Sequence, residues 1–201
     1  MCLMVIASTA LASPLMDFSQ GKGSIDLTWR NTENSASGDS FEKKYNLDGA
    51  ITFGLGNKWA FQYRNFEPKS DNTRIEDDDL TLKLATNEFN LLYKLDKNVA
   101  AFAGYVTMKG TMTLVGGESD SSDTKKMWQG GVMATAPLGE KLNLWGMVGA
   151  GNNLTNWEAG MGYAFSPNAE LNVNYRMIKV DELSGANVKA KGLGFGLTFK
   201  W

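Results

Sequence analysis

The last eleven residues of the chain alternate in polarity without a break. Glycine, threonine and lysine occupy one face, whereas the apolar face carries Leu193, Phe195, Leu197, Phe199 and Trp201. A period of two residues over this length predicts a β-strand with one apolar side. A terminal strand of a soluble protein gains little from five exposed apolar side chains. A membrane barrel needs such a side to face lipid, so the end of the chain favours a closed transmembrane β-barrel.

The same five apolar residues resemble the C-terminal targeting signal of outer-membrane β-barrel proteins, in which the assembly machinery reads a terminal aromatic residue. Over the mature chain, the sequence resembles the small porin-like barrels of Gram-negative-type bacteria. The resemblance implies localisation in the outer membrane and contact with outer-membrane lipid and lipopolysaccharide. It also implies insertion by the barrel-assembly machinery, and we expect a monomer or weak oligomer. The net charge of −2 indicates no nucleic-acid partner.

The rest of the chain divides into similar short segments with alternating polarity. They predict an all-β fold, an antiparallel up-and-down transmembrane barrel of about ten strands, with eight strands as the alternative. The predicted strands cover residues 22–30, 44–55, 58–66, 79–95, 99–113, 126–138, 142–151, 155–165, 169–180 and the terminal segment.

The predicted connections differ in length, as in outer-membrane barrels with long loops on one rim and tight turns on the other. The expected long loops are 31–43, 67–78, 114–125 and 181–189. One strand is irregular, because Leu82 and Leu84 have the opposite parity to Phe89 and Leu91. This phase change predicts a β-bulge near Ala85–Asn87, or an upper half of the strand that leaves the membrane.

The start of the chain reads as a targeting segment. Residues 1–12 are apolar and end in Ala10-Leu11-Ala12, which is typical of a signal-peptide cleavage site. A basic region is missing, so the signal peptide is expected to be truncated at its start. The only cysteine, Cys2, lies in this segment, and residues 13–201 are predicted to form a single barrel domain without cysteine.

The polar face of the strands is predicted to line the lumen. A soluble barrel would turn that face outward, but its many glycines and the apolar terminal strand favour the membrane arrangement. The charges on this face nearly balance, so they either pair and plug the lumen or line a narrow water path. The predicted lumen-lining residues are Asp26, Arg30, Lys44, Asp48, Gln62, Arg64, Lys94, Glu158, Glu170 and Arg176.

Aromatic residues gather near both ends of the predicted strands, as in the interfacial belts of membrane barrels. The belt residues toward the long loops are Trp29, Tyr45, Trp128 and Trp157. Toward the tight turns they are Trp59, Tyr93, Phe165 and Trp201.

The chain has no histidine. Outer-membrane enzymes of similar architecture, the omptin proteases and the barrel phospholipases and deacylases, use histidine in catalysis, so we predict no enzyme. No catalytic, cofactor-binding or metal site is predicted, and the acidic run at 76–79 reads as a charged loop rather than a calcium site.

Three functions remain open at this point. The first is porin-like passive diffusion of small solutes through a narrow charged lumen. The alternative is a non-conducting surface barrel, adhesive or structural, that acts through the loops 31–43, 67–78 and 114–125. A soluble ligand-binding barrel of the lipocalin sort is the third and is the least favoured.

Overall fold

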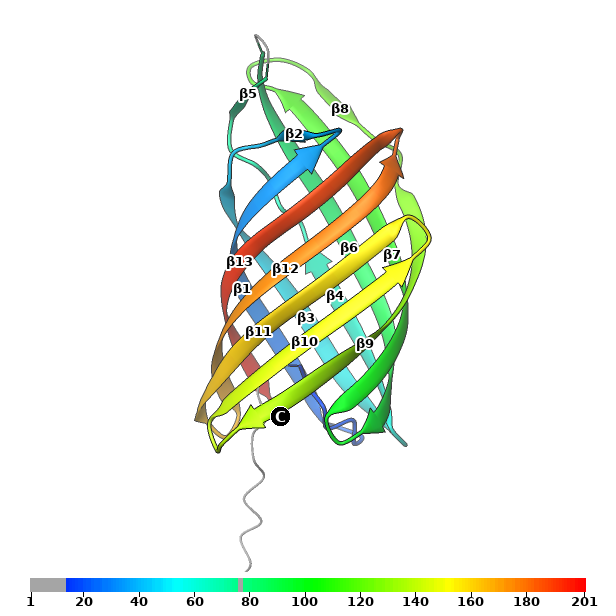
Figure 1. Ribbon diagram of the computed structural model, residues 1–201, viewed down its shortest axis with the longest axis vertical. Helices are drawn as coiled ribbons and strands as arrows, with labels where there is room; N and C mark the ends of the chain where they lie inside the picture. Colours follow the sequence, from blue (N-terminus) through cyan, green and yellow to red (C-terminus); the bar gives the residue numbers. More distant parts are fainter. Residues whose placement is uncertain (1–13, 76–77) are drawn as a thin grey trace, which may run out of the picture.

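A computed structural model describes residues 14–75 and 78–201, so the predicted signal peptide lies outside the described residues. Ten antiparallel strands pair in chain order and close into a barrel (Figure 1). These strands are β1 (Gly23–Ala36), β3 (Lys44–Gly56), β4 (Trp59–Phe66), β6 (Asp78–Asp96), β7 (Val99–Leu114), β9 (Lys125–Leu138), β10 (Leu142–Gly151), β11 (Leu154–Ser166), β12 (Ala169–Leu183) and β13 (Ala186–Lys200). The predicted fold class is confirmed, with ten strands rather than eight.

Three short strands extend the barrel at the end opposite the chain termini (Figure 1). They are β2 (Asp39–Ser40), β5 (Thr73–Ile75) and β8 (Ser119–Ser121), which pair with β1, β6 and β7 respectively. Because long loops mark the extracellular rim of outer-membrane barrels, we take this end as extracellular and the other as periplasmic. No helix among the described residues is long and apolar enough to cross a membrane.

The first and last barrel strands close the structure. β1 pairs with β13 from Ser24↔Lys200 to Ala36↔Val188. At the periplasmic end, the backbone N–H of Gly23 donates to the Trp201 carbonyl at 3.2 Å, and the Trp201 N–H donates back at 3.1 Å. Pairing along the whole seam leaves no open barrel edge, which is what a membrane-spanning sheet requires.

Two of the predicted long loops, 31–43 and 181–189, are wrong because most of their residues belong to strands. β1 continues to Ala36, so most of the predicted loop 31–43 is strand, and β12 and β13 are separated only by residues 184–185. The upper parts of these strands are polar on the outer face, so the alternation that marks a half-buried strand disappears there although the backbone pairing continues.

The predicted bulge near Ala85–Asn87 is also wrong. β6 pairs with β4 and β7 in an unbroken register through this region. Leu82 and Leu84 point into the barrel and are at most 3% exposed, whereas Phe89 and Leu91 point outward and are at least 41% exposed. The phase change arises because the inward-facing side chains of β6 are apolar near the extracellular end and polar in the middle of the barrel.

The outer surface of the barrel carries a continuous apolar belt. Each barrel strand turns large apolar side chains outward, and alternate residues of the same strand point inward. Figure 1 shows the tilted strands on which this belt lies. A belt of this kind can stay exposed only in lipid, because water would penalise it.

The interior is filled in three layers along the barrel axis. The upper apolar layer, at the extracellular end, consists of Phe41, Phe66, Leu82, Leu84, Val106, Met108, Met127, Leu154, Ile178, Val180, Leu183, Val188 and Ala190. The lower apolar layer, at the periplasmic end, consists of Met16, Phe18, Ala60, Leu92, Ala100, Phe102, Met133 and Met147. Between them lies the charged layer, formed by Arg30, Asp48, Arg64, Glu88, Glu158 and Arg176.

Candidate functional site

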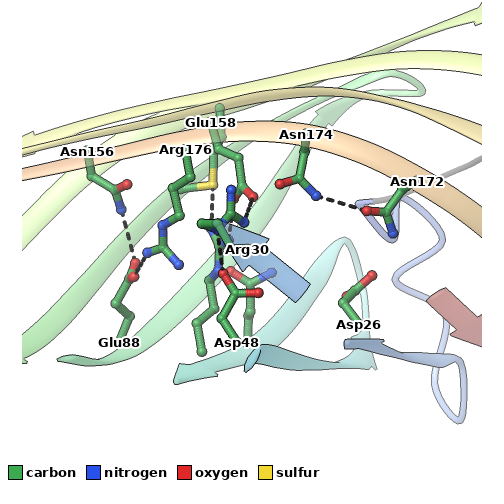
Figure 2. Close-up of polar contacts among 12 residues, drawn as sticks. Asp26, Arg30, Asp48, Glu88, Asn156, Glu158, Asn172, Asn174 and Arg176 are labelled. Carbon is green, nitrogen blue, oxygen red and sulfur yellow. Dashed lines mark hydrogen bonds and ion pairs between the residues drawn. The ribbon is translucent and has the colours of Figure 1, made fainter. Parts of the chain in front are cut away.

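Glu158 joins two arginines inside the barrel, and Figure 2 shows it beside one of them, Arg30. Its Oε1 atom accepts a hydrogen bond from Arg30 Nη2 at 2.9 Å, and its Oε2 atom is ion-paired with Arg64. Arg30 Nε also donates to Asp48 Oδ2 at 2.8 Å. These four side chains come from β1, β3, β4 and β11. Because β4 and β11 lie on opposite walls of the barrel, the ion pair between Arg64 and Glu158 crosses the lumen.

A second ion pair lies beside the first. Arg176 is paired with Glu88, and the other carboxylate oxygen of Glu88 accepts hydrogen bonds from Gln129 Nε2 at 3.2 Å and Asn156 Nδ2 at 3.1 Å (Figure 2). The Arg176 guanidinium lies 4.6 Å from the ring centre of Phe66, where the charged layer meets the upper apolar layer. Each carboxylate of the charged layer therefore has a cationic partner. A carboxylate buried inside a protein needs such a partner, because burial without one is costly.

The structure brings together six of the ten predicted lumen residues. Arg30, Asp48, Arg64, Glu158 and Arg176 belong to the charged layer. Gln62 lies below them, where its Nε2 atom donates to Thr52 Oγ1 at 3.2 Å. The ion pairs span the lumen at this level.

The other four predicted lumen residues lie away from the charged layer. Asp26 is half-buried beside Thr198, and Glu170 is buried 3.2 Å from Lys200 Nζ. Lys44 is half-buried at the extracellular end, 3.5 Å from Asp71. Lys94 is half-buried near the periplasmic end of β6. None of the four contributes to the central ion pairs.

Glu88 and Gln129 belong to the central network but were not predicted. Glu88 precedes Asn90 by two residues and therefore shares its inward face. That parity places Glu88 in the lumen, but the predicted lumen-lining residues of this strand included only Lys94.

A segment before the first strand enters the barrel from the periplasmic side. We call residues 14–22 the strap. Leu15, Met16 and Phe18 are at most 5% exposed, and the Phe18 carbonyl accepts a hydrogen bond from the Gly56 N–H at 2.9 Å. A second backbone bond of 2.8 Å joins Gly54 N–H to the Lys22 carbonyl. The strap therefore supplies side chains to the lower apolar layer and fills the periplasmic mouth.

A small cavity remains between the strap and the charged layer. Its volume is about 50 Å³, and its walls include Pro14, Gln62, Arg64, Trp145 and Glu158. That volume holds only a few water molecules, because one water needs at least about 10–15 Å³.

Inward-facing glycines make room for the central side chains. A Cβ atom at Gly160 would lie 2.7 Å from Asn174 Cβ and 2.8 Å from the Trp145 ring. At Gly194 it would lie 2.4 Å from Thr28 Cγ2. These contacts are too short for real Cβ atoms, so the lumen has no room for a side chain at either position.

The extracellular end is hollowed by a recess of about 360 Å³. Its floor is apolar, with Leu82, Leu84, Leu183 and Val188 from the upper apolar layer. Its rim carries the polar segment 120–123, which follows β7. The recess stops at the upper apolar layer and does not reach the charged layer.

The predicted belt residues point outward at both ends of the barrel. On the periplasmic side, the rings of Trp59 and Tyr93 lie 4.7 Å apart, and Trp201 packs edge-on against Phe53 at 6.0 Å. Toward the extracellular side, Tyr105 contacts Trp128 at 5.1 Å, and Trp157 stacks on Tyr175 at 5.4 Å. The three remaining belt residues, Trp29, Tyr45 and Phe165, are all more than half exposed on the outer face.

Among residues 14–75 and 78–201, no group of three or more acidic or cysteine side chains is placed to hold a metal ion. Two residues of the acidic run at 76–79, Glu76 and Asp77, lie outside the described residues.

The closed barrel, the apolar outer belt and the paired terminal strand define an integral outer-membrane β-barrel protein, as the sequence predicted. No protein-family model matches the chain, and no curated protein matches its sequence.

Several solved structures resemble the chain, and the likeness to one of them, CymD, supports the same fold. The CymD monoaromatic hydrocarbon channel is 8% identical, with a TM-score of 0.53 over 96% of this chain and 91% of that chain. Neisserial surface protein A is 16% identical, with a TM-score of 0.49 over 90% of this chain and all of that chain. Ail, the attachment invasion locus protein of Yersinia pestis, is 14% identical, with a TM-score of 0.48 over 90% of this chain and 99% of that chain. At 8% identity, the likeness to CymD supports the barrel fold and nothing finer.

Proposed function

We propose that this protein is a closed outer-membrane barrel that acts through its extracellular end and does not pass solutes through its interior. The charged layer carries the proposal, because its six side chains are at most 10% exposed and join opposite walls of the barrel. Porin-like diffusion needs a continuous water path. The filled interior therefore favours the non-conducting surface barrel over the porin.

The two apolar layers support the same conclusion. An ion that entered from the periplasm would have to pass Met16 and Phe18 of the strap, and an ion from outside would meet the upper apolar layer. Both barriers are apolar, and an ion would lose its hydration in each of them.

Single-channel recording of the refolded protein in a planar bilayer tests the proposal. We expect stable insertion without discrete conductance steps, and no swelling of liposomes in solutions of small sugars. A porin of known conductance, refolded in the same way, serves as the positive control. Reproducible steps from the wild-type protein would overturn the proposal and restore the porin hypothesis.

The surface role itself depends on the extracellular segments 67–77 and 115–124, which carry β5 and β8. We expect cells that display the wild-type barrel to bind immobilised host or matrix molecules. Cells that display a variant with residues 115–124 replaced by a Gly/Ser segment of the same length should lose this binding. A variant with only the periplasmic turn 139–141 shortened is the control. Unchanged binding by the variant lacking 115–124 would contradict a role for that segment.

The proposal also includes contact of the terminal strand with the assembly machinery and of the outer belt with lipid. Leu193, Phe195, Leu197, Phe199 and Trp201 all point outward, where the assembly machinery and then lipid can contact them. No catalysis is included, since the chain has no histidine to serve as a general base.

The recess favours a second candidate function, the binding of a small apolar molecule at the extracellular end. Its volume of about 360 Å³ lies in the range of small-molecule sites, and its floor is apolar. Naphthalene binding, followed by its fluorescence, tests this function. Leu183→Gln should weaken binding, whereas Ser119→Ala, outside the recess, should leave it unchanged. Equal binding by both variants would exclude the recess as the site.

A further inference from the structure

Lysines gather on the outer face of β12 and β13, just beyond the apolar belt. Lys179 and Lys189 are register partners, and Lys191 lies two residues from Lys189 on the same outward face. Lys43 joins this group through Glu33, whose carboxylate lies 3.0 Å from Lys191 Nζ and 3.7 Å from Lys43 Nζ. We call Lys43, Lys179, Lys189 and Lys191 the lysine cluster.

The cluster carries more positive charge than its own neighbours neutralise. Its carboxylate partners are Glu33 and Asp181, the latter 2.8 Å from Lys179. Four lysines thus share two carboxylates. Like charges directly opposite each other on neighbouring strands destabilise a sheet, and Lys179 opposite Lys189 is such a pair. An anion bound between these strands would remove this cost.

Successive rows of the sheet change from apolar to cationic over a short distance. Trp29, Phe195 and Val173 form one outward row, and Asn31, Leu193 and Tyr175 form the next. The two rows beyond contain Glu33 with Lys191, and then Lys189 with Lys179. This order matches a membrane interface, with acyl chains below and charged headgroups above.

A recess lies at this boundary. Its volume is about 220 Å³, and Lys43, Lys191 and Glu33 form its upper part. Tyr45, Tyr175, Leu193 and Phe195 form its lower, more apolar part. The recess therefore offers cations to a headgroup and apolar surface to a chain of the same ligand.

We propose that the lysine cluster and this recess form a binding site for a phosphorylated, multiply acylated lipid of the outer leaflet, the chemistry of lipid A. A phosphate group lies against Lys189, Lys179 and Lys191, and an acyl chain packs on Leu193 and Phe195. Phosphate is the anion that several ammonium groups bind together. The proposal depends on the outer-membrane placement and is independent of whether the lumen conducts.

Lipid A binding to the protein in phospholipid nanodiscs tests the site, with native mass spectrometry as the readout. The test variant is Lys179→Gln/Lys189→Gln/Lys191→Gln. The control variant is Lys83→Gln/Lys109→Gln/Lys126→Gln. It removes three other lysines that also point outward, one each from β6, β7 and β9. We expect the test variant to bind lipid A about tenfold or more weakly than the wild type, and the control to bind like the wild type.

Two further probes identify the group that is recognised. Lipid A without its phosphates should bind to the wild type as weakly as lipid A binds to the test variant. Inorganic phosphate should compete only weakly, because it lacks acyl chains. Equal loss in the two variants, or full binding of the phosphate-free lipid, would overturn the proposal.

Thermal unfolding, measured without and with lipid A, is a second test of the proposal. Without lipid A, Lys189→Gln should raise the resistance to thermal unfolding, because it removes repulsion between Lys179 and Lys189. With lipid A, the wild type should become the more stable protein. The absence of this reversal would contradict an anion between the two strands.

Discussion

Arg30 and Glu158 meet across the interior of the barrel with an Nη2–Oε1 distance of 2.9 Å, although 128 residues separate them in the chain. Arg30 lies on the first barrel strand and Glu158 on β11, on another wall. One hydrogen bond thus links β1, at the closing seam, to a strand three positions away around the barrel. Because Glu158 also binds Arg64, its removal leaves two buried guanidinium groups without that carboxylate.

The first prediction concerns this carboxylate. Glu158→Gln should destabilise the barrel by about 3–5 kcal/mol, the usual cost of breaking a buried ion pair by removing one partner. Equilibrium unfolding by urea in lipid vesicles measures the change. Glu140→Gln in the exposed turn before β10 is the control and should be neutral. A neutral Glu158→Gln would mean that water already solvates the charged layer.

The second prediction concerns the lipid-facing side. Phe195 is 53% exposed on the outer face near the middle of the terminal strand. Phe195→Arg should cost about 2–4 kcal/mol if the side chain faces the bilayer midplane. Folding free energies in lipid vesicles give the value, with Lys109→Arg beyond the belt as the control. A cost near zero would refute the assigned depth of Phe195.

The third prediction concerns crowding in the lumen. Gly160→Ala should destabilise the protein by about 1–3 kcal/mol, because the new methyl group would press on Asn174 and Trp145. Gly146→Ala on the neighbouring strand is a matched control, since its Cβ would meet only the Glu158 carbonyl, at 3.6 Å. Thermal unfolding of the two variants compares them. Equal melting temperatures would show that the side chains around Gly160 are not tightly packed.

The fourth prediction concerns pH at the extracellular end. The pKa of the Glu67 carboxyl is lowered from 4.5, chiefly by its hydrogen bond with Lys83 and then by one with Asn65. A lowered pKa stabilises the folded state above 4.5, and this contribution is lost as the pH falls through the folded pKa. The protection of amides in the segment after β4, expressed relative to their intrinsic exchange rates at each pH, should therefore fall in acid.

Lys83→Gln tests the cause of this dependence. It should bring the pKa of Glu67 back toward 4.5, as measured by titration of the carboxyl carbon resonance, and should speed exchange already at neutral pH. Lys109→Gln on β7 should change neither quantity. An unchanged titration in Lys83→Gln would assign the shift to Asn65 instead.

Alternation of polarity predicts the strands well wherever lipid lies on one side and polar groups on the other. This is why the strand from 169 and the terminal strand were identified in the correct phase. The same rule fails above the belt, where water lies outside β1, and Thr32 and Asn34 face inward beside polar outer neighbours. Where both faces of a strand are polar, its sequence pattern cannot be distinguished from that of a loop.

The interior was harder to predict than the exterior. Leu82, Leu84 and Val106 face a lumen that is apolar at that depth, so an apolar side chain does not by itself mark the lipid side. The parity of Arg30 and Glu158 indicated an inward direction, but only the shear and closure of the barrel decide which charges meet. The strap has no periodicity, and its apolar residues gave no sign of where they pack.

The strap and the seam meet at the periplasmic end of the barrel. The strap leaves the lumen next to Gly23, whose backbone is hydrogen-bonded to that of Trp201. In the complete structure Leu15, Met16 and Phe18 are enclosed by the barrel. A barrel whose strap has not entered would leave them in the periplasm, where a protease could cut them. Intact residues 14–22 after protease treatment would therefore distinguish a correctly assembled barrel from one that merely inserted.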